Sequence, residues 1–136
     1  MIIELIQNNI ILSCFLAWVI TQTSKGLIIS YKKKKFGWEY LLATGHMPSS
    51  HSGIVSSLVA AVYLDQGFTS LFAVSFVFAL VVMRDSFGAR FLIGEQAKVI
   101  NKLAKTKLKE VTGHKFKEVV VGATIGVIVA IIVYSF

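Results

Sequence analysis

Long apolar stretches separated by short polar segments dominate this chain of 136 residues. None shows the strict alternation of a half-buried strand, and each approaches the roughly 20 residues that a helix needs to cross a hydrocarbon core of about 30 Å. The pattern therefore predicts an all-α integral membrane protein with four transmembrane helices in a bundle. The expected helices cover residues 2–31, 49–64, 69–87 and 116–136.

Composition agrees with a membrane location. Hydrophobic residues make up 55% of the chain and proline occurs once, which is too apolar for an ordinary soluble domain of this length. The start, Met-Ile-Ile-Glu, lacks the basic segment of a secretory signal, so we expect the first helix to stay in the protein. Cys14 has no second cysteine to pair with, and we expect a small buried residue there. We expect a single membrane domain over residues 1–136.

Positive charge is unevenly distributed, and this orients the predicted helices. The formal net charge is +7, and lysines gather after the first helix and between the third and fourth, which a four-helix topology places on one side. Because short basic loops stay in the cytoplasm, we expect a multi-pass protein of the cell membrane with this side cytoplasmic. The charged residues of the other side are Glu4 and Asp65. The lysines in question are Lys32 to Lys35, Lys98, Lys102, Lys105, Lys107, Lys109, Lys115 and Lys117.

Such a basic surface is typical of contact with anionic lipid, and we expect no nucleic-acid partner. Residues 99–111, from Val99 to Val111, follow an amphipathic helical pattern, which predicts a helix in the plane of the membrane interface. Gly122 and Gly126 form a Gly-x-x-x-Gly pattern, which lets another helix approach closely. They prompt the hypothesis of a homodimer.

Candidate chemistry gathers near the cytoplasmic ends of the predicted helices. Lys25 lies inside the apolar continuation of the first helix, where an ionisable residue is either a functional group or a side chain that reaches back to the interface. Ser49, Ser50 and His51 stand where a loop becomes the second helix, and helix N-termini bind anions. Ser49 alone is also a good helix cap.

Two further groups follow along the chain. Arg84 and Asp85 end the third helix, with Arg90 shortly after, and a guanidinium there either grips phosphate oxygens or forms a structural ion pair. His114 and Glu118 are four residues apart, so they share a helix face and the carboxylate can orient the imidazole. A histidine in a loop is otherwise usually solvated.

Taken in order, these motifs resemble the type 2 phosphatidic acid phosphatase superfamily, which also contains the vanadium-dependent haloperoxidases. The resemblance covers most of the chain and is greatest to a divergent branch of small membrane proteins. That branch has Met-Pro-Ser-Ser-His, then Asp-x2-Gly-x-Arg, then Gly-His-x3-Glu-Val. Its motifs are matched here by Met47 to His51, Asp85 to Arg90 and Gly113 to Val119, and Lys25-x6-Lys32 approximates the superfamily motif Lys-x6-Arg-Pro.

The resemblance implies two-step hydrolysis of a phosphomonoester on a membrane phospholipid, with no metal ion or other cofactor. His114 would attack phosphorus, Glu118 would orient it, and His51 would protonate the departing alcohol. Because Arg90 is far from His114 in the sequence, the fold must bring the two together. The implied phosphate-binding residues are Lys25, Lys32, Ser49, Ser50, Asp85 and Arg90.

The sequence leaves alternatives open for both the substrate and the activity. A site at the cytoplasmic headgroup level makes phosphatidylglycerophosphate the first expectation, with polyprenyl diphosphate as the alternative phosphatase substrate. A non-catalytic protein that binds or moves phospholipid is the rival from another class, although binding alone needs cations and amides and not a nucleophile with an acid. The choice between Arg84 and Arg90 as phosphate ligand, and the role of His46, stay open.

Overall fold

The computed structural model of the chain describes residues 8–42, 46–108 and 113–136. Within these ranges every regular element is a helix, which confirms the predicted all-α class. The expected helix start at residue 2, together with Glu4, Lys109 and Val111, lies outside the described residues. The elements are α2 (Asn9–Lys33), the 3-10 helix η1 (Trp38–Leu42), α3 (Ser50–Gln66), α4 (Ser70–Phe87), α5 (Ala89–Ala104) and α6 (Phe116–Tyr134).

Polar side chains determine where three of the helices begin. The Asn8 Oδ1 atom accepts hydrogen bonds from the amides of Ile10 and Ile11 at 3.0 and 3.1 Å. Ser49 and Thr69 cap α3 and α4 in the same manner, each accepting from the amide three residues on. Such caps satisfy amides that have no partner inside the helix. The cap predicted at Ser49 is confirmed.

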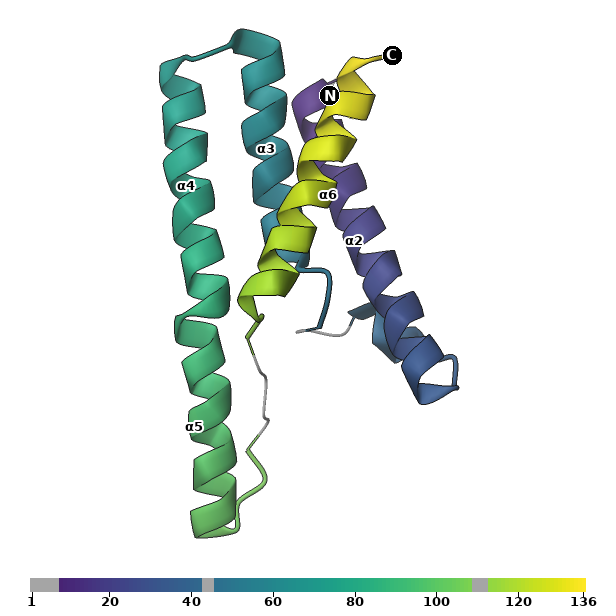
Figure 1. Cartoon of the computed structure of the whole chain (residues 1–136), viewed down its shortest axis with the longest axis vertical. Coiled ribbons are helices and arrows are strands. Elements are labelled where there is room, and N and C mark those ends of the chain that lie inside the picture. Colours follow the sequence, from purple (N-terminus) through teal and green to yellow (C-terminus); the bar gives the residue numbers. More distant parts are fainter. Residues whose placement is uncertain (1–7, 43–45, 109–112) are drawn as a thin grey trace.

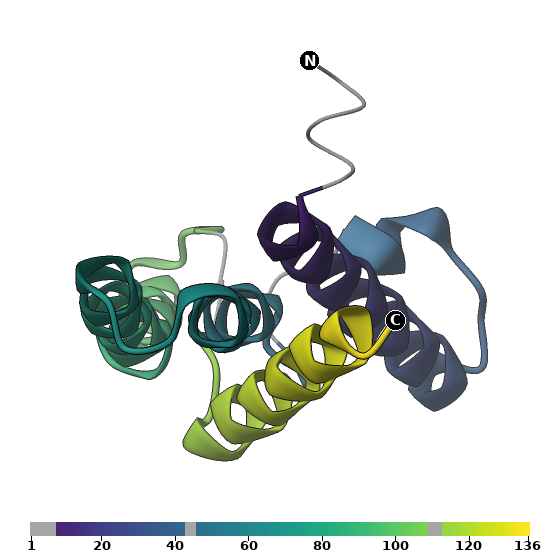
Figure 2. The same ribbon diagram turned by 90° about the horizontal axis from the view of Figure 1, so that it is seen from above.

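α3 is the central helix of the bundle (Figures 1 and 2). Seen from above, α4 lies on one side of it and α2 and α6 lie on the other (Figure 2). α2 and α4 run in one direction while α3 and α6 return, so the end of α2 and the starts of α3 and α6 lie toward the same end of the bundle (Figure 1). The candidate site residues belong to this end.

Small residues bring α6 against α3. A Cβ atom at Gly122 would overlap the carbonyl oxygen of Ser49, and one at Gly126 would overlap that of Gly53. The Gly-x-x-x-Gly pattern therefore serves a close helix contact, as predicted, but inside the chain. Because both glycines are buried there, they supply no face for a second copy, and the homodimer stays a prediction without their support.

Large apolar side chains point away from the bundle. Phe76, Val77 and Phe78 are 46%, 58% and 52% exposed, whereas the buried positions of α3 are mostly serine, alanine, valine and glycine. This distribution is typical of helices surrounded by lipid, where close packing of small residues replaces a hydrophobic driving force.

Three of the four expected membrane crossings have the length and composition they need. Among the described residues these are Asn9–Lys33, the continuous stretch Ser70–Ala104, and Phe116–Tyr134. α3 has 17 residues and extends for about 25 Å, less than the hydrocarbon core of about 30 Å. The crossing by α3, and with it the count of four, stays a prediction.

α4 and α5 form one nearly straight rod that extends beyond the other helices (Figure 1). The amide of Gly88, the residue between them, donates to the Arg84 carbonyl oxygen at 2.9 Å. This bond keeps the helical pattern through the junction, and the amphipathic helix predicted over residues 99–111 is found in part, as residues 99–104 at the end of a longer helix. The amphipathic helix begins at Ala89, continues α4 and ends at Ala104. Its position in the plane of the membrane interface stays a prediction.

Candidate active site

His114 lies just before α6, and Glu118 holds its imidazole from the first turn. Nδ1 of His114 is 3.2 Å from Oε2 of Glu118, and the same oxygen accepts the amide of Lys115 at 3.1 Å. The helix dipole favours a carboxylate at this position. His114 is only 5% exposed, so it is not a solvated loop residue. With Nδ1–H donated to the carboxylate, Nε2 retains its lone pair.

His51, in the first turn of α3, faces this buried histidine. The two ring centroids are 6.5 Å apart and the ring planes meet at 62°. His51 is exposed and His114 is buried, so the pair stands at the boundary between solvent and the interior of the bundle.

Lys25 is turned into the bundle. It is 3% exposed, and its Nζ donates to Ser50 Oγ at 3.0 Å and to Gln22 Oε1 at 3.1 Å. The Ser50 hydroxyl in turn donates to Gln22 Oε1 at 2.6 Å. The lysine therefore does not reach back to the membrane surface. Its charge acts on both imidazoles.

Two main-chain hydrogen bonds join the segments that carry these residues. The Ser49 amide donates to the Glu118 carbonyl oxygen at 3.1 Å, and the His114 amide donates to the Ser86 carbonyl oxygen at 2.9 Å. They connect the starts of α3 and α6 and the end of α4. Motifs that are distant in the sequence thus meet at one end of the bundle.

Arg90 and Asp85 form the part contributed by the α4–α5 junction. Arg90 Nε lies 2.6 Å from Asp85 Oδ2, and the side chains are 55% and 44% exposed. Gly113 packs against the main chain of Arg90, where a Cβ would overlap it. The fold therefore brings the main chain of Arg90 to Gly113, the residue before His114, while a contact of the Arg90 side chain with His114 stays a prediction. Both charged groups act on the His51 imidazole.

Arg84 and Lys32 have other surroundings. The Arg84 guanidinium lies over the Phe87 ring, 5.4 Å from its centroid, and Lys32 is exposed in the last turn of α2. Arg90 is the arginine whose charge acts on His51, and the structural ion pair weighed for Arg84 with Asp85 forms with Arg90 instead. Lys32 as a phosphate ligand stays a prediction. Among the described residues, the charged groups that act on the two imidazoles are Lys25, Asp85, Arg90 and Glu118.

Gln22 and Ser86 take part in the site but were not among the predicted residues. An amide side chain three residues before Lys25 lies on the same helix face, and that spacing was a usable signal for Gln22. Ser86 contributes its carbonyl oxygen. A main-chain contribution leaves no side-chain pattern to find.

Burial lowers the pKa of the His114 imidazole below its ordinary value of 6.5. The hydrogen bond that His114 donates to Glu118 opposes this shift, and the positive charge of Lys25 adds to it. The balance favours a neutral imidazole at pH 7.

These features define a class: an all-helical membrane protein with a histidine pair and a buried lysine at one end of its bundle. Residues 6–129 match the Divergent PAP2 family, and the chain belongs to this family. The family resemblance inferred from the motifs is thereby confirmed.

The chain is also similar to the uncharacterized membrane protein YuiD of Bacillus subtilis (strain 168). The two are 36% identical over 155 aligned positions, which cover 98% of each chain. No solved structure matches the chain. The comparisons agree with the apolar helices in placing the protein in a membrane.

Proposed function

We propose that the protein is a lipid phosphate phosphatase that works through a phosphohistidine intermediate. The observation that carries this proposal is the pairing of a buried, carboxylate-held imidazole with a second, exposed imidazole 6.5 Å away. Nucleophilic catalysis needs a nucleophile oriented by a third group and an acid within reach. Binding alone would need only the cations and the helix amides.

In the first step, Nε2 of His114 attacks the phosphorus atom. The P–N bond forms as the bond from phosphorus to the lipid oxygen breaks, and His51 transfers its proton to that oxygen so that the lipid leaves as an alcohol. Glu118 keeps the proton on Nδ1 and stabilises the positive charge that the ring gains.

In the second step, water replaces the histidine. His51, now neutral, takes a proton from the water as its oxygen attacks phosphorus, and the P–N bond breaks to restore His114 and release inorganic phosphate. Phosphoryl transfer depends mainly on positioning and on charge stabilisation. Lys25 and Arg90 supply positive charge, and the first amides of α3 and the Ser50 hydroxyl supply hydrogen bonds.

A lipid phosphate on the cytoplasmic leaflet is the proposed substrate, with phosphatidylglycerophosphate first among candidates. Support comes from the position of the site at the end of the bundle toward which the lysine-rich end of α2, with Lys32 to Lys35, also lies. Positive charge of this kind favours the cytoplasmic side of a cell membrane. We propose no nucleic-acid partner.

Phosphate release by the purified full-length protein in mixed micelles tests this function. Phosphatidylglycerophosphate, phosphatidic acid and undecaprenyl diphosphate are compared, with a chelator present. We expect release that survives the chelator and falls at least about 10³-fold in His114→Ala. His46→Ala, which removes an exposed imidazole, is the matched control. If wild type and His114→Ala are equally inactive and both still bind lipid, the binding or transport alternative is established instead.

A further inference from the structure

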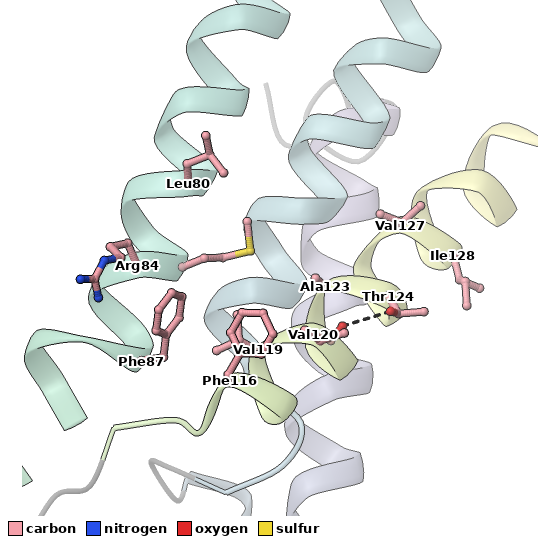
Figure 3. A pocket seen from close by; sticks show the side chains of 11 residues that line it. Leu80, Arg84, Phe87, Phe116, Val119, Val120, Ala123, Thr124, Val127 and Ile128 are labelled. Atoms are coloured by element: carbon pink, nitrogen blue, oxygen red, sulfur yellow. Dashed lines mark hydrogen bonds between the residues drawn. The ribbon is translucent and has the colours of Figure 1, made fainter.

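An apolar groove of about 740 Å³ lies between α4 and α6 (Figure 3). Leu80 and Phe87 line its α4 side, and Phe116, Ala123 and Val127 are among the α6 residues opposite. Its volume falls within the range of about 300–1,000 Å³ that is usual for ligand sites.

The groove offers its occupant almost no free polar group. Arg84 and Thr124 are the polar side chains in its lining. The Thr124 hydroxyl already donates to the Val120 carbonyl oxygen at 3.0 Å, as Figure 3 shows. The Arg84 guanidinium lies over Phe87 and is directed away from α6 (Figure 3). A hydrocarbon occupant would match this distribution.

The groove ends beside the segments that carry the candidate active site. Phe87 and Phe116, which both line the groove, form an edge-to-face pair with centroids 5.6 Å apart. Phe87 follows Ser86, whose carbonyl oxygen accepts the His114 amide, and Phe116 is two residues after His114. The histidine pair and the groove are therefore neighbouring features of the end of α4 and the start of α6.

The groove also extends deep into the bundle. A second cavity of about 360 Å³ shares Leu80, Met83 and Val127 with the first and continues along α3 and α4 to Phe72. Phe72 and Phe87 are fifteen residues apart in one helix, which corresponds to about 22 Å. That depth exceeds the half-thickness of about 15 Å of a hydrocarbon core of about 30 Å.

We propose that this groove seats one extended hydrocarbon chain of the lipid whose phosphate lies at the histidine pair. The proposal rests on the proposed function for the identity of the headgroup. Seating the chain in the groove fixes the phosphate ester beside His114 and admits the lipid sideways from the membrane. It makes Val127, which lines both cavities, a residue that determines chain recognition.

A bulky residue in the groove tests the proposal. Val127→Trp would fill the passage between the cavities, and Ile131→Trp, one turn further along α6 and outside both linings, is the matched control. For a long-chain lipid phosphate we expect Val127→Trp to lower kcat/KM about tenfold or more, mainly through KM. Val127→Trp and Ile131→Trp should hydrolyse water-soluble phenyl phosphate at the same rate.

Lipid contact is measured separately from turnover. Phosphatidic acid with a photoreactive group in one acyl chain is crosslinked to the protein in phosphatidylcholine nanodiscs, and the labelled peptides are mapped. We expect label on α4 and α6 that unlabelled phosphatidic acid displaces and that Val127→Trp reduces about tenfold. Equal labelling of Val127→Trp and Ile131→Trp would overturn the groove proposal. If the protein hydrolyses none of the phosphate substrates, the proposed function is overturned. The labelling result then still tests the groove proposal by itself.

Discussion

Glu118 determines which nitrogen of His114 carries the proton. Its Oε2 lies 3.2 Å from Nδ1, and the Lys115 amide fixes that oxygen at 3.1 Å. An acceptor on Nδ1 leaves Nε2 unprotonated, which is the form that attacks phosphorus. Glu118 is thus a positioning residue that acts through the histidine.

Glu118→Gln is expected to lower kcat about 10²-fold or more, because the amide can donate to Nδ1 and favour the wrong tautomer. The contact with Glu118 raises the pKa of His114, so its loss should also move the acid limb of the pH–rate profile to lower pH. Glu95→Gln, which affects an exposed ion pair with Lys98, is the control. An unchanged pH profile would contradict the positioning role.

Stability should also depend on the protonation of His114. Because burial lowers its pKa, the unfolded chain binds a proton at a pH where the folded protein does not. Stability is therefore complete above pH 6.5 and declines as pH falls through the folded-state pKa. Melting temperatures in mild detergent between pH 5 and 8 should show this decline in wild type and a smaller one in His114→Asn. If melting temperature depends on pH in the same way in wild type and in His114→Asn, then His114 is not the cause of the decline.

At the scale of elements, the contact between α3 and α6 aligns the site. Gly122 packs on the Ser49 carbonyl, at the N-cap of the helix that carries Ser50 and His51. Gly126 packs one turn deeper, on Gly53. The same close approach therefore stabilises the bundle and sets the position of the phosphate-binding segment.

Gly122→Ala and Gly126→Ala separate these two effects. Each adds a methyl group where a carbonyl oxygen already lies, and overpacking of this kind costs about 1–3 kcal/mol. We expect both to lower the melting temperature, and Gly122→Ala to reduce phosphatase activity more, since it displaces Ser49. Val121→Leu, at a partly exposed neighbour, is the control. Equal activity loss in both glycine variants would mean that only overall stability matters.

At the scale of the whole molecule, the bundle has two chemically different ends. The basic segments around Lys34 and Lys105 lie toward the end with the histidine pair, whereas the start of α2, the α3–α4 connection and the end of α6 lie toward the other (Figure 1). At the far end, the Tyr134 hydroxyl donates to Asp65 at 3.3 Å.

Labelling of single introduced cysteines tests which end of the bundle faces the cytoplasm. In a Cys14→Ser background, Lys34→Cys and Lys105→Cys should react with a membrane-impermeant thiol reagent only after the cytoplasmic side is opened. Gln66→Cys and Ser135→Cys should react in intact cells. The reverse labelling would place the site outside and would favour polyprenyl diphosphate over a lipid of the cytoplasmic leaflet.

Much of this arrangement follows from the sequence because membrane helices and sequence motifs leave strong patterns. The apolar stretches predicted α2, α4 and α6 well, and the spacing of His114 and Glu118 predicted their contact. The sequence did not predict the rod formed by α4 and α5, because a glycine between an apolar and an amphipathic stretch is typical of a helix end. The hydrogen bonds from the Gly88 amide to the Arg84 carbonyl and from the Leu92 amide to the Gly88 carbonyl show that the helix continues.

Other features had no signal in a single sequence. The inward turn of Lys25 depends on the position of Ser50 on another helix, which no local pattern specifies. The apolar groove arises from the placement of α4 relative to α6 and is visible only in three dimensions. The phosphate-binding roles of Lys32 and Arg90 concern contacts with a substrate, and they stay predictions.

The main-chain bonds from Ser49 to Glu118 and from His114 to Ser86 set limits on how this protein can change over evolutionary time. A bond between an amide and a carbonyl group is indifferent to the side chain that either residue carries. These two bonds therefore do not by themselves require a particular side chain at the residues that form them. Gly113 and Gly122 lack that freedom, because any side chain there would push the connected segments apart.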